Sequence, residues 1–337
     1  MKFLLRGARR DDVKGLVDLA SQFSLLNLPA DKKVLGEKVE RSIASFAGEL
    51  TKREAEYVFV VEDLEAEAIV GSSLILAKHG TEDNPHTFFK IVKENRFSED
   101  LGLGFIHQIL QFKEDTDGPS EIGGLLVDRA YRRRPEKLGK QVSLVRFLYM
   151  GMAQTEFEKR VLCELTPPLT DGGRSEFWEA LGRRFTGLPY QEADMISQGN
   201  KEFIGSLFPK DDIYLCLLDS KARLVMGRVG VETRPAQHLL ESIGFEYLHE
   251  VDPFDGGPHY GATVAEISLV KKGQWAQLHK ADKANFVSHA LVGFKRDGEF
   301  RAVYTAYDKQ ENKVIVPAQS MQVLDAGPGE KVFFAQT

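Results

Sequence analysis

Several cationic side chains gather in one turn, between a short apolar run and a segment with helical spacing. The apolar run, 122–127, predicts a buried strand, and apolar residues recur every three or four positions after Gly139, which predicts a helix. The basic residues of this turn are Arg132, Arg133, Arg134, Lys137 and Lys140. Because free N–H groups at the start of a helix attract anions, the segment could hold a diphosphate. A strand, a solvated basic loop and a helix without a ligand is the simpler alternative.

A second segment with reactive side chains is 251–262, VDPFDGGPHYGA. The Gly-Gly-Pro at its centre predicts a tight turn. Asp252 and Asp255 flank this turn, and His259 follows it. Two carboxylates beside a turn could bind a cationic substrate. The alternative is a surface turn between two strands.

Composition limits the class of protein. The 337 residues are enough for a large core or for two packed subdomains. The apolar share of 42% is ordinary for a globular protein, and the 22 phenylalanines indicate a well-filled core. A net charge of −6 argues against a general nucleic-acid binder. The basic turn therefore stands out against an acidic background.

Cysteine usage and the termini suggest a cytoplasmic location. The two cysteines, Cys163 and Cys216, lie in apolar runs, so we expect reduced and buried thiols. No Cys/His cluster predicts a zinc site, and no metal is expected. The N-terminus has only four consecutive apolar residues before dense charge, unlike a signal peptide. No run reaches the roughly 18 apolar residues that cross a membrane.

The order of the predicted elements favours an α+β fold with mixed, mostly antiparallel sheets. Predicted strands are 2–7, 57–62, 68–77, 86–93, 121–127, 160–165, 213–218 and 223–231. Predicted helices are 13–23, capped by Asp11 or Asp12, and 35–46, 139–150, 176–185, 192–208 and 236–243.

Two similar segments suggest an internal duplication. Residues 177–185 and 238–248 each predict a helix that ends at a glycine before phenylalanine and a strand. A common helix–glycine–strand unit without duplication is the equal alternative. From Lys271, short strands, including one at 321–325, predict a small all-β appendage. We therefore expect one lobe at 1–190, a second partial lobe at 191–270, and the appendage at 271–337.

Five motifs follow one another along the chain: LLVDRAYR, the G-x-x-x-S-x-x-R-F block from Gly139 to Phe147, SEFWEALGRRF, TRPAQHLLESIGFEY and VDPFDGGP. In these motifs and their order, the chain resembles the arginine/ornithine N-succinyltransferases of the Gcn5-related acyl-CoA N-acyltransferase superfamily. The resemblance implies two acyltransferase lobes in tandem. It also implies direct attack of an amine on the thioester of an acyl-CoA, succinyl-CoA in this family.

The resemblance also implies which residues bind the co-substrate. The strand before the basic turn, Leu125, Leu126 and Val127, would contact the pantetheine arm, and its N–H groups would stabilise the oxyanion. The implied diphosphate loop is Leu138, Gly139, Lys140, Gln141, Val142 and Ser143, with Arg133 nearby. The expected amine-binding residues are Asp252, Asp255 and Glu164.

The chain departs from the family at the proton-handling position. Where the family has its proposed proton-donor histidine, this chain has Gly230. The segment 163–167 also lacks the family's arginine and glycine, and 203–209 lacks its glutamate. Glu232 would share the face of Gly230 on a strand, so Glu232, His259 and His249 are the candidates for a replacement base.

Three hypotheses follow. The chain is an N-acyltransferase that moves an acyl group, succinyl in the first hypothesis, from acyl-CoA to arginine, ornithine or a relative. Alternatively, it is a catalytically weakened relative that binds acyl-CoA or serves as a partner subunit. In the third, it uses a different donor and acceptor. The expected partners are a small amine and acyl-CoA, without nucleic acid or membrane, and a homo- or hetero-oligomer stays open.

Overall fold

A computed structural model describes residues 2–23, 28–197, 202–281, 286 and 288–337. The chain forms two compact units, each built from separated stretches of sequence. The first unit comprises Met1–Lys78, Ser120–Val161 and Thr263–Thr337, and the second comprises His79–Pro119 and Leu162–Ala262. The lobes expected from the sequence were consecutive stretches. Their proposed duplication stays a prediction.

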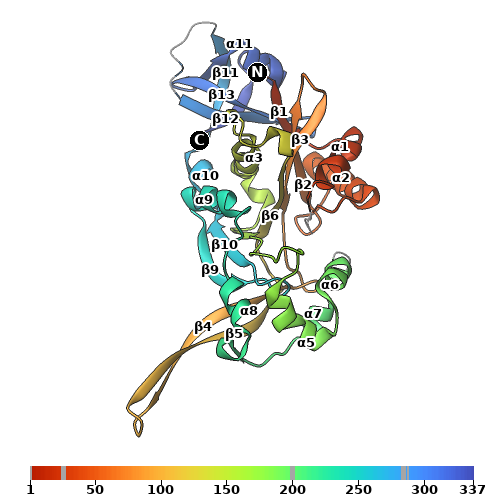
Figure 1. Ribbon diagram of the computed structural model, residues 1–337. Helices are drawn as coiled ribbons and strands as arrows, with labels where there is room; N and C mark the ends of the chain where they lie inside the picture. Colours follow the sequence, from red (N-terminus) through yellow and green to blue (C-terminus); the bar gives the residue numbers. More distant parts are fainter. Residues whose placement is uncertain (1, 24–27, 198–201, 282–285, 287) are drawn as a thin grey trace. The chain divides into compact units, whose positions relative to one another are not determined.

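The first unit contains an antiparallel sheet with helices on both faces (Figure 1). Its strands in sheet order are β1 (Phe3–Gly7), β2 (Glu56–Asp63), β3 (Ala68–Leu76) and β6 (Ser120–Val127), and its helices are α1 (Val13–Ala20), α2 (Lys32–Ala47), α3 (Leu138–Met152) and α10 (Ser268–Lys272). Alternate residues of β2 face opposite sides: Val58 packs with Leu35 of α2, and Tyr57 packs with Tyr149 of α3.

Local sequence explains the ends of α2. The Asp31 carboxylate accepts hydrogen bonds from the N–H groups of Lys33 and Val34, at 2.8 and 2.9 Å, and so caps the helix. The helix ends at Gly48, whose φ of +77° suits a residue without a side chain. The predicted helix 35–46 is confirmed, and it begins slightly earlier.

An aromatic cluster fills the core beside this sheet. The Phe46 ring centroid lies 5.1 Å from that of Tyr57, 5.5 Å from that of Phe59 and 5.1 Å from that of Tyr149. Phe300 stacks on Phe46 at 6.1 Å. These rings come from four separated segments of the chain, so the cluster ties those segments of the first unit together.

The C-terminal strands close into a small barrel within the first unit. They are β11 (Gln274–Ala281), β12 (Ser288–Arg296), β13 (Glu299–Gln310), β14 (Lys313–Pro317) and β15 (Lys331–Gln336). Strand β12 pairs with both β15 and β13, which closes the set, and β13 also pairs with β1. The strand predicted at 321–325 is wrong, because residues 321–324 belong to helix α11 (Ala318–Leu324), which packs Met321 and Leu324 into the barrel core.

Asp11 and Asp12 do not cap α1 as predicted. The Asp12 carboxylate accepts hydrogen bonds from the buried guanidinium of Arg6 at 2.6 and 2.9 Å, and from the N–H of Arg9 at 2.6 Å. Helix α1 has no side-chain cap. The carboxylate instead neutralises a charge that burial would otherwise make costly.

The second unit combines a strongly twisted sheet with short helices. Its strands in sheet order are β7 (Arg160–Glu164), whose last three residues belong to this unit, β10 (Pro258–Thr263), β9 (Glu246–Val251), β4 (His86–Ser98), β5 (Leu103–Asp115) and β8 (Ile213–Tyr214). Its helices are α4 (Glu176–Ala180), α5 (Gly182–Thr186), α6 (Tyr190–Ser197), α7 (Glu202–Leu207), α8 (Ser220–Val225) and α9 (Arg234–Ser242). The aromatic core of this unit includes Trp178, whose ring centroid lies 4.6 Å from that of Phe254.

Three elements of this unit differ from those that the sequence predicts. The predicted helix 192–208 appears as α6 and α7, and residues 198–201 lie outside the described part. The predicted strand 213–218 is only two residues long and continues as a 3-10 turn, so Cys216 is exposed rather than buried. The predicted strand 223–231 is the end of α8 and a turn, because the N–H of Gly227 bonds to the Gly256 carbonyl instead of a neighbouring strand.

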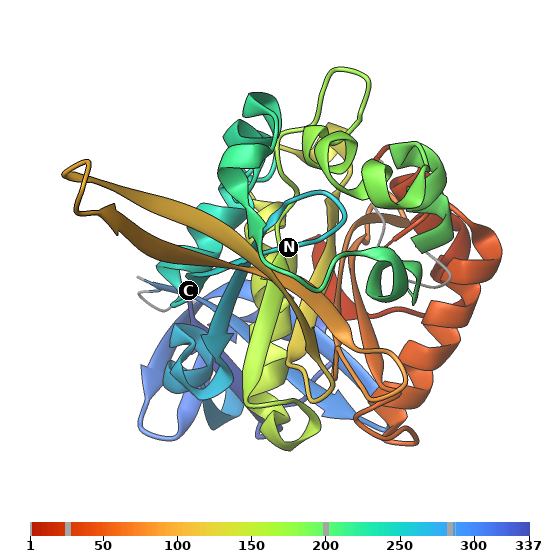
Figure 2. The ribbon, with the colours of Figure 1, turned by 90° about the horizontal axis from the view of Figure 1, so that it is seen from below.

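Strands β4 and β5 form one long hairpin, visible in Figures 1 and 2. Its tip exposes large apolar side chains, with Phe97 at 70% and Ile106 at 69% exposure. Such exposed apolar groups on an unusually long hairpin are typical of a contact surface. Within the described ranges, no helix is long and apolar enough to cross a membrane.

We predict that Phe46→Ala lowers the free energy of unfolding by about 3–5 kcal/mol, because it removes the centre of the aromatic cluster and leaves a cavity. Urea unfolding followed by fluorescence measures the loss. Phe97→Ala, at an exposed position of the hairpin, is the control and should cost less than about 1 kcal/mol. Equal losses in the two variants would contradict the assignment of Phe46 to the core.

Candidate functional site

Strand β6 carries a bulge at the position expected for the pantetheine contact. Two residues, Gly124 and Leu125, stand opposite Ser73 alone in the pairing with β3. Gly124 has a φ of +57°, and a β-carbon there would approach the Leu74 side chain to 2.8 Å, so only glycine fits. A bulge takes backbone groups out of the regular ladder and re-aims them. The predicted pantetheine strand, Leu125–Val127, therefore begins at a built-in irregularity.

Helix α3 begins without a side-chain cap. The residue just before the helix, Lys137, has a φ of +53°. The Lys137 carbonyl accepts hydrogen bonds from the N–H groups of Lys140 and Gln141, at 2.9 and 3.2 Å. The N–H groups of the two preceding residues, Leu138 and Gly139, have no acceptor within the helix. A β-carbon at Gly139 would meet only the Val127 side chain, at 3.8 Å. The backbone there can accommodate the close approach of an anion.

Most side chains of the predicted diphosphate loop hold the turn itself. Leu138 and Val142 are buried in the core. The Gln141 amide donates to the Glu136 carbonyl at 2.7 Å, and the Ser143 hydroxyl accepts from the Arg146 guanidinium at 2.8 Å. The backbone N–H groups are thus the main contribution of this loop to an anion site.

The basic side chains of the turn differ in their surroundings. Arg132 donates to the Val127 carbonyl at 3.1 Å and lies over the Phe23 ring. Arg134 lies 4.0 Å from the centroid of the Tyr131 ring. Arg133, with a φ of +59°, is exposed and makes no hydrogen bond or ion pair with any residue described here. Arg133 is therefore the arginine best able to contact a ligand.

In the second unit, the acidic loop is a tight turn, as predicted. One oxygen of Asp252 accepts the N–H groups of Phe254 and Asp255 at 2.6 and 3.1 Å. One oxygen of Asp255 accepts the N–H of Gly257 at 2.7 Å. Both carboxylates already accept hydrogen bonds within their own turn. To bind the amine, each would use the oxygen that does not accept these bonds. That role stays a prediction.

Gly230 lies against the backbone of the 163–167 segment. Its N–H donates to the Thr166 carbonyl at 2.9 Å. A β-carbon at Gly230 would approach the Pro167 carbonyl oxygen to 2.9 Å and the Thr166 carbonyl oxygen to 3.2 Å. These are the two segments at which the sequence leads us to expect departures from the family pattern, and they touch one another. A β-carbon at residue 230 would meet main chain.

Glu232 does not share a strand face with Gly230, so that prediction is wrong. The N–H of Thr233 donates to the Gly230 carbonyl at 3.0 Å, which folds these residues into a turn before α9. Glu232 is exposed in this turn, and His249 is exposed on β9. Both side chains reach solvent, where a substrate could meet them.

His259, on β10, is fully buried, with 0% exposure. Its Nε2 lies 3.7 Å from Glu164 Oε1, and its Nδ1 lies 3.9 Å from Glu250 Oε2. Burial lowers the pKa of His259, although the charges of Glu164, Asp252 and Glu250 oppose this effect. Among the described residues, neither ring nitrogen has a hydrogen-bond partner.

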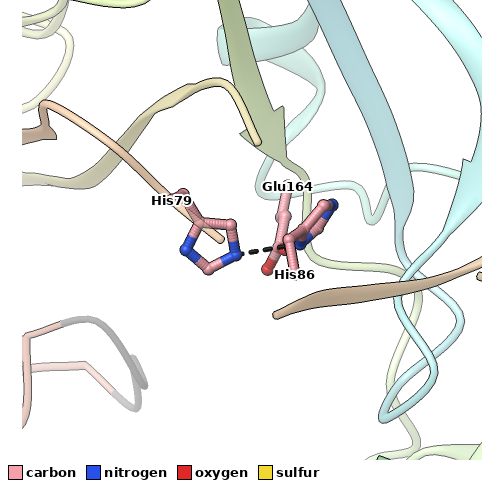
Figure 3. A group of neighbouring side chains, drawn as sticks. All are labelled: His79, His86 and Glu164. Carbon is pink, nitrogen blue, oxygen red and sulfur yellow. Dashed lines mark hydrogen bonds and ion pairs between the residues drawn. The ribbon is translucent and has the colours of Figure 1, made fainter. Parts of the chain in front are cut away.

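Two further histidines approach the same glutamate (Figure 3). His86 Nδ1 lies 3.9 Å from Glu164 Oε1, and His79 Nε2 lies 2.9 Å from His86 Nδ1. The sequence analysis missed His79 and His86, because they and His259 are far apart in the chain and follow no known ligand spacing. In the sequence, the sign that His79 and His86 could lie close together is that they stand at the two ends of the loop before β4.

Comparisons with known proteins agree along nearly the whole chain. A family model described as arginine N-succinyltransferase beta subunit matches residues 3–269. Proteins named arginine N-succinyltransferase from Escherichia coli O1:K1 / APEC and Shigella boydii serotype 18 are each 32% identical over 333 residues, which is 98% of this chain and 96% of theirs.

The fold agrees as well. The structure of arginine/ornithine succinyltransferase subunit AI from Pseudomonas aeruginosa superposes with a TM-score of 0.87 at 27% identity, over 99% of this chain and 98% of that one. The predicted α+β acyltransferase fold with mixed, mostly antiparallel sheets is confirmed.

We predict that Gly230→Ala lowers the free energy of unfolding by about 1–3 kcal/mol, because the added methyl group meets backbone that must move. The matched control is Gly36→Ala within α2, where a β-carbon meets nothing within 4 Å. That change should stabilise the protein by about 0.5–1 kcal/mol. Thermal unfolding of both variants measures the difference, and a stable Gly230→Ala protein would show that the position is open.

Proposed function

Because the chain belongs to the arginine N-succinyltransferase family, we propose that it transfers a succinyl group from succinyl-CoA to the amine of arginine, ornithine or a related amino acid. The observation that carries this proposal is the agreement in sequence and fold with that family along nearly the whole chain. Acyl-CoA is the co-substrate, and succinyl is the acyl group that the family name indicates.

The first unit supports the binding of CoA. The bulge at Gly124 re-aims the backbone of β6, and the uncapped start of α3 offers N–H groups to the diphosphate. Lys140 and Arg133 add positive charge near these N–H groups in the chain. In this proposal, Leu125–Val127 contact the pantetheine arm.

The reaction is a direct displacement. The neutral amine attacks the thioester carbonyl, the carbon–sulfur bond then breaks, and the amine loses one proton while the CoA thiolate gains one. Backbone N–H groups of Leu125–Val127 are the proposed donors to the oxyanion. The acyl group passes directly from CoA to the amine in this scheme, so no side chain acts as a nucleophile and no acyl-enzyme forms.

Glu232 is the proposed proton acceptor. It lies in the turn that starts at Gly230, next to the position of the family histidine, and it is exposed. His259 was the other candidate, but its complete burial argues against contact with a substrate amine. Glu164, Asp252 and Asp255 stay proposed contacts for a cationic substrate.

A second candidate function is that of a weakened relative that binds acyl-CoA without efficient turnover. The close approach of the Pro167 carbonyl to Gly230 favours it, because a side chain at residue 230 would require the backbone to move. The family model and the Pseudomonas aeruginosa structure are both described as subunits, which supports an assembly in which such a chain has a partner. The exposed tip of the β4–β5 hairpin is a candidate contact surface for that assembly.

Incubation of the purified chain with succinyl-CoA and L-arginine or L-ornithine should release CoA thiol and form the N-succinyl amino acid. Thiol titration and mass spectrometry measure the two products. Thermal stabilisation by CoA without any product would favour the weakened relative instead. No turnover and no stabilisation would exclude both functions.

We expect the double variant Arg133→Ala/Lys140→Ala to raise the KM for succinyl-CoA about 10-fold with little change in kcat, because it removes charge-assisted contacts with the diphosphate. Lys14→Ala, at an exposed position of α1, is the control and should leave KM unchanged. An unchanged KM in the double variant would place the diphosphate elsewhere.

Glu232→Gln should lower kcat about 100-fold, because general-base catalysis contributes about 10²–10⁴-fold. The variant should retain its KM for succinyl-CoA. Glu246→Gln, at the exposed start of β9, is the matched control. Normal turnover by the Glu232 variant would eliminate Glu232 as the base.

A further inference from the structure

Four side chains in the second unit direct ligand atoms toward one another. Three of them, His79, His86 and Glu164, lie together in Figure 3, each with a ligand atom within 4.8 Å of the others. The fourth, His259, places Nε2 3.7 Å from the same Glu164 oxygen that lies 3.9 Å from His86 Nδ1. The four atoms are three imidazole nitrogens and one carboxylate oxygen.

The spacing of these atoms suits a metal ion. Nitrogen and oxygen ligands lie about 2.0–2.2 Å from zinc, so two ligands of one tetrahedral ion are about 3.3 Å apart. The distances of 2.9, 3.7 and 3.9 Å between neighbouring ligand atoms bracket that value. His259 belongs to a second, overlapping group with Glu164 and Asp252, so its side chain must move toward His79 and His86 for all four residues to bind one ion.

His259 provides independent support. Its ring is fully buried, and neither nitrogen has a hydrogen-bond partner among the residues that the structure describes. An unsatisfied buried polar group is costly and calls for an explanation such as an ion. Its Nε2 faces Glu164 Oε1, where an ion bound by the other three residues would lie.

We propose that the second unit binds one Zn²⁺, or a similar divalent transition-metal ion, through His79, His86, Glu164 and His259. Three imidazoles favour such ions over magnesium or calcium, which prefer oxygen ligands. The site has a structural role, and in this proposal the Glu164 carboxylate binds the ion, which leaves Asp252 and Asp255 as the proposed contacts for the amine. It ties the loop before β4 to the end of β7 and to β10.

Surrounding carboxylates complete the site. Glu250 Oε2 lies 3.9 Å from His259 Nδ1, on the side of the ring opposite the proposed ligand atom. Metal-bound histidines commonly turn their second nitrogen toward a carboxylate. Glu164, Asp252 and His259 also place ligand atoms within 4.8 Å of one another, so Asp252 adds further negative charge beside the ion.

Metal titration tests the proposal. The full chain, without an affinity tag and treated with EDTA, is titrated with Zn²⁺ in competition with a chromogenic chelator, and with Co²⁺ as a spectroscopic probe. One equivalent of Zn²⁺ should bind, and Co²⁺ should give the visible spectrum of a nitrogen- and oxygen-ligated ion. Free Zn²⁺ at about one hundred times its Kd should raise Tm by about 5 °C.

The variant His79→Gln/His86→Gln preserves side-chain size and polarity, so it should fold with an unchanged Tm in EDTA. Its Zn²⁺ affinity should fall at least about 10-fold, the loss that even outer-shell changes cause. The control, His238→Gln/His289→Gln, removes two exposed histidines and should bind normally. Absence of stoichiometric Zn²⁺ binding, or equal losses in both variants, would overturn the proposal and leave His79 and His86 as a hydrogen-bonded pair.

Discussion

The hydrogen bond from the Gly230 N–H to the Thr166 carbonyl constrains the chemistry open to this chain. It holds two segments of the second unit so close that the Pro167 carbonyl fills the space of a β-carbon at residue 230. A histidine at residue 230 and the present path of Thr166–Pro167 exclude one another sterically. Thr166, Pro167 and Gly230 therefore form one backbone contact, in which a change at any of the three affects the others.

The proposed binding of acyl-CoA depends on backbone groups rather than on particular side chains. The β6 bulge and the uncapped start of α3 are backbone features, and their capacity to bind an anion depends little on which side chains surround them. Buried Leu138 and Val142, and the hydrogen bonds of Gln141 and Ser143, keep that backbone in place.

Much of the fold was predictable because the sequence pattern is strong there. The apolar runs of β2 and β3 and the helix α2 were predicted at nearly their observed bounds. Predictions failed where tertiary contacts override local preference. Residues 223–231 look like a strand, but the N–H of Gly227 bonds to the Gly256 carbonyl. Residues 321–324 belong to a helix, which places Met321 and Leu324 in the barrel core.

The candidate sites, too, were predictable only where the residues lie close together in the sequence. The basic turn and the acidic turn were predicted because each is continuous in sequence. The group of His79, His86, Glu164 and His259 was not, because only the folded sheet of the second unit brings these four residues together. The contact of Gly230 with Pro167 was likewise hidden, since these residues are more than sixty positions apart in the sequence.

Hydrogen–deuterium exchange with and without succinyl-CoA is the most direct test of the central claim, that the backbone of β6 and the start of α3 bind acyl-CoA. The account predicts that succinyl-CoA slows exchange in peptides covering 120–127 and 138–143, and that desulfo-CoA analogues with the diphosphate do the same for 138–143. Unchanged exchange in both segments at saturating succinyl-CoA would contradict it.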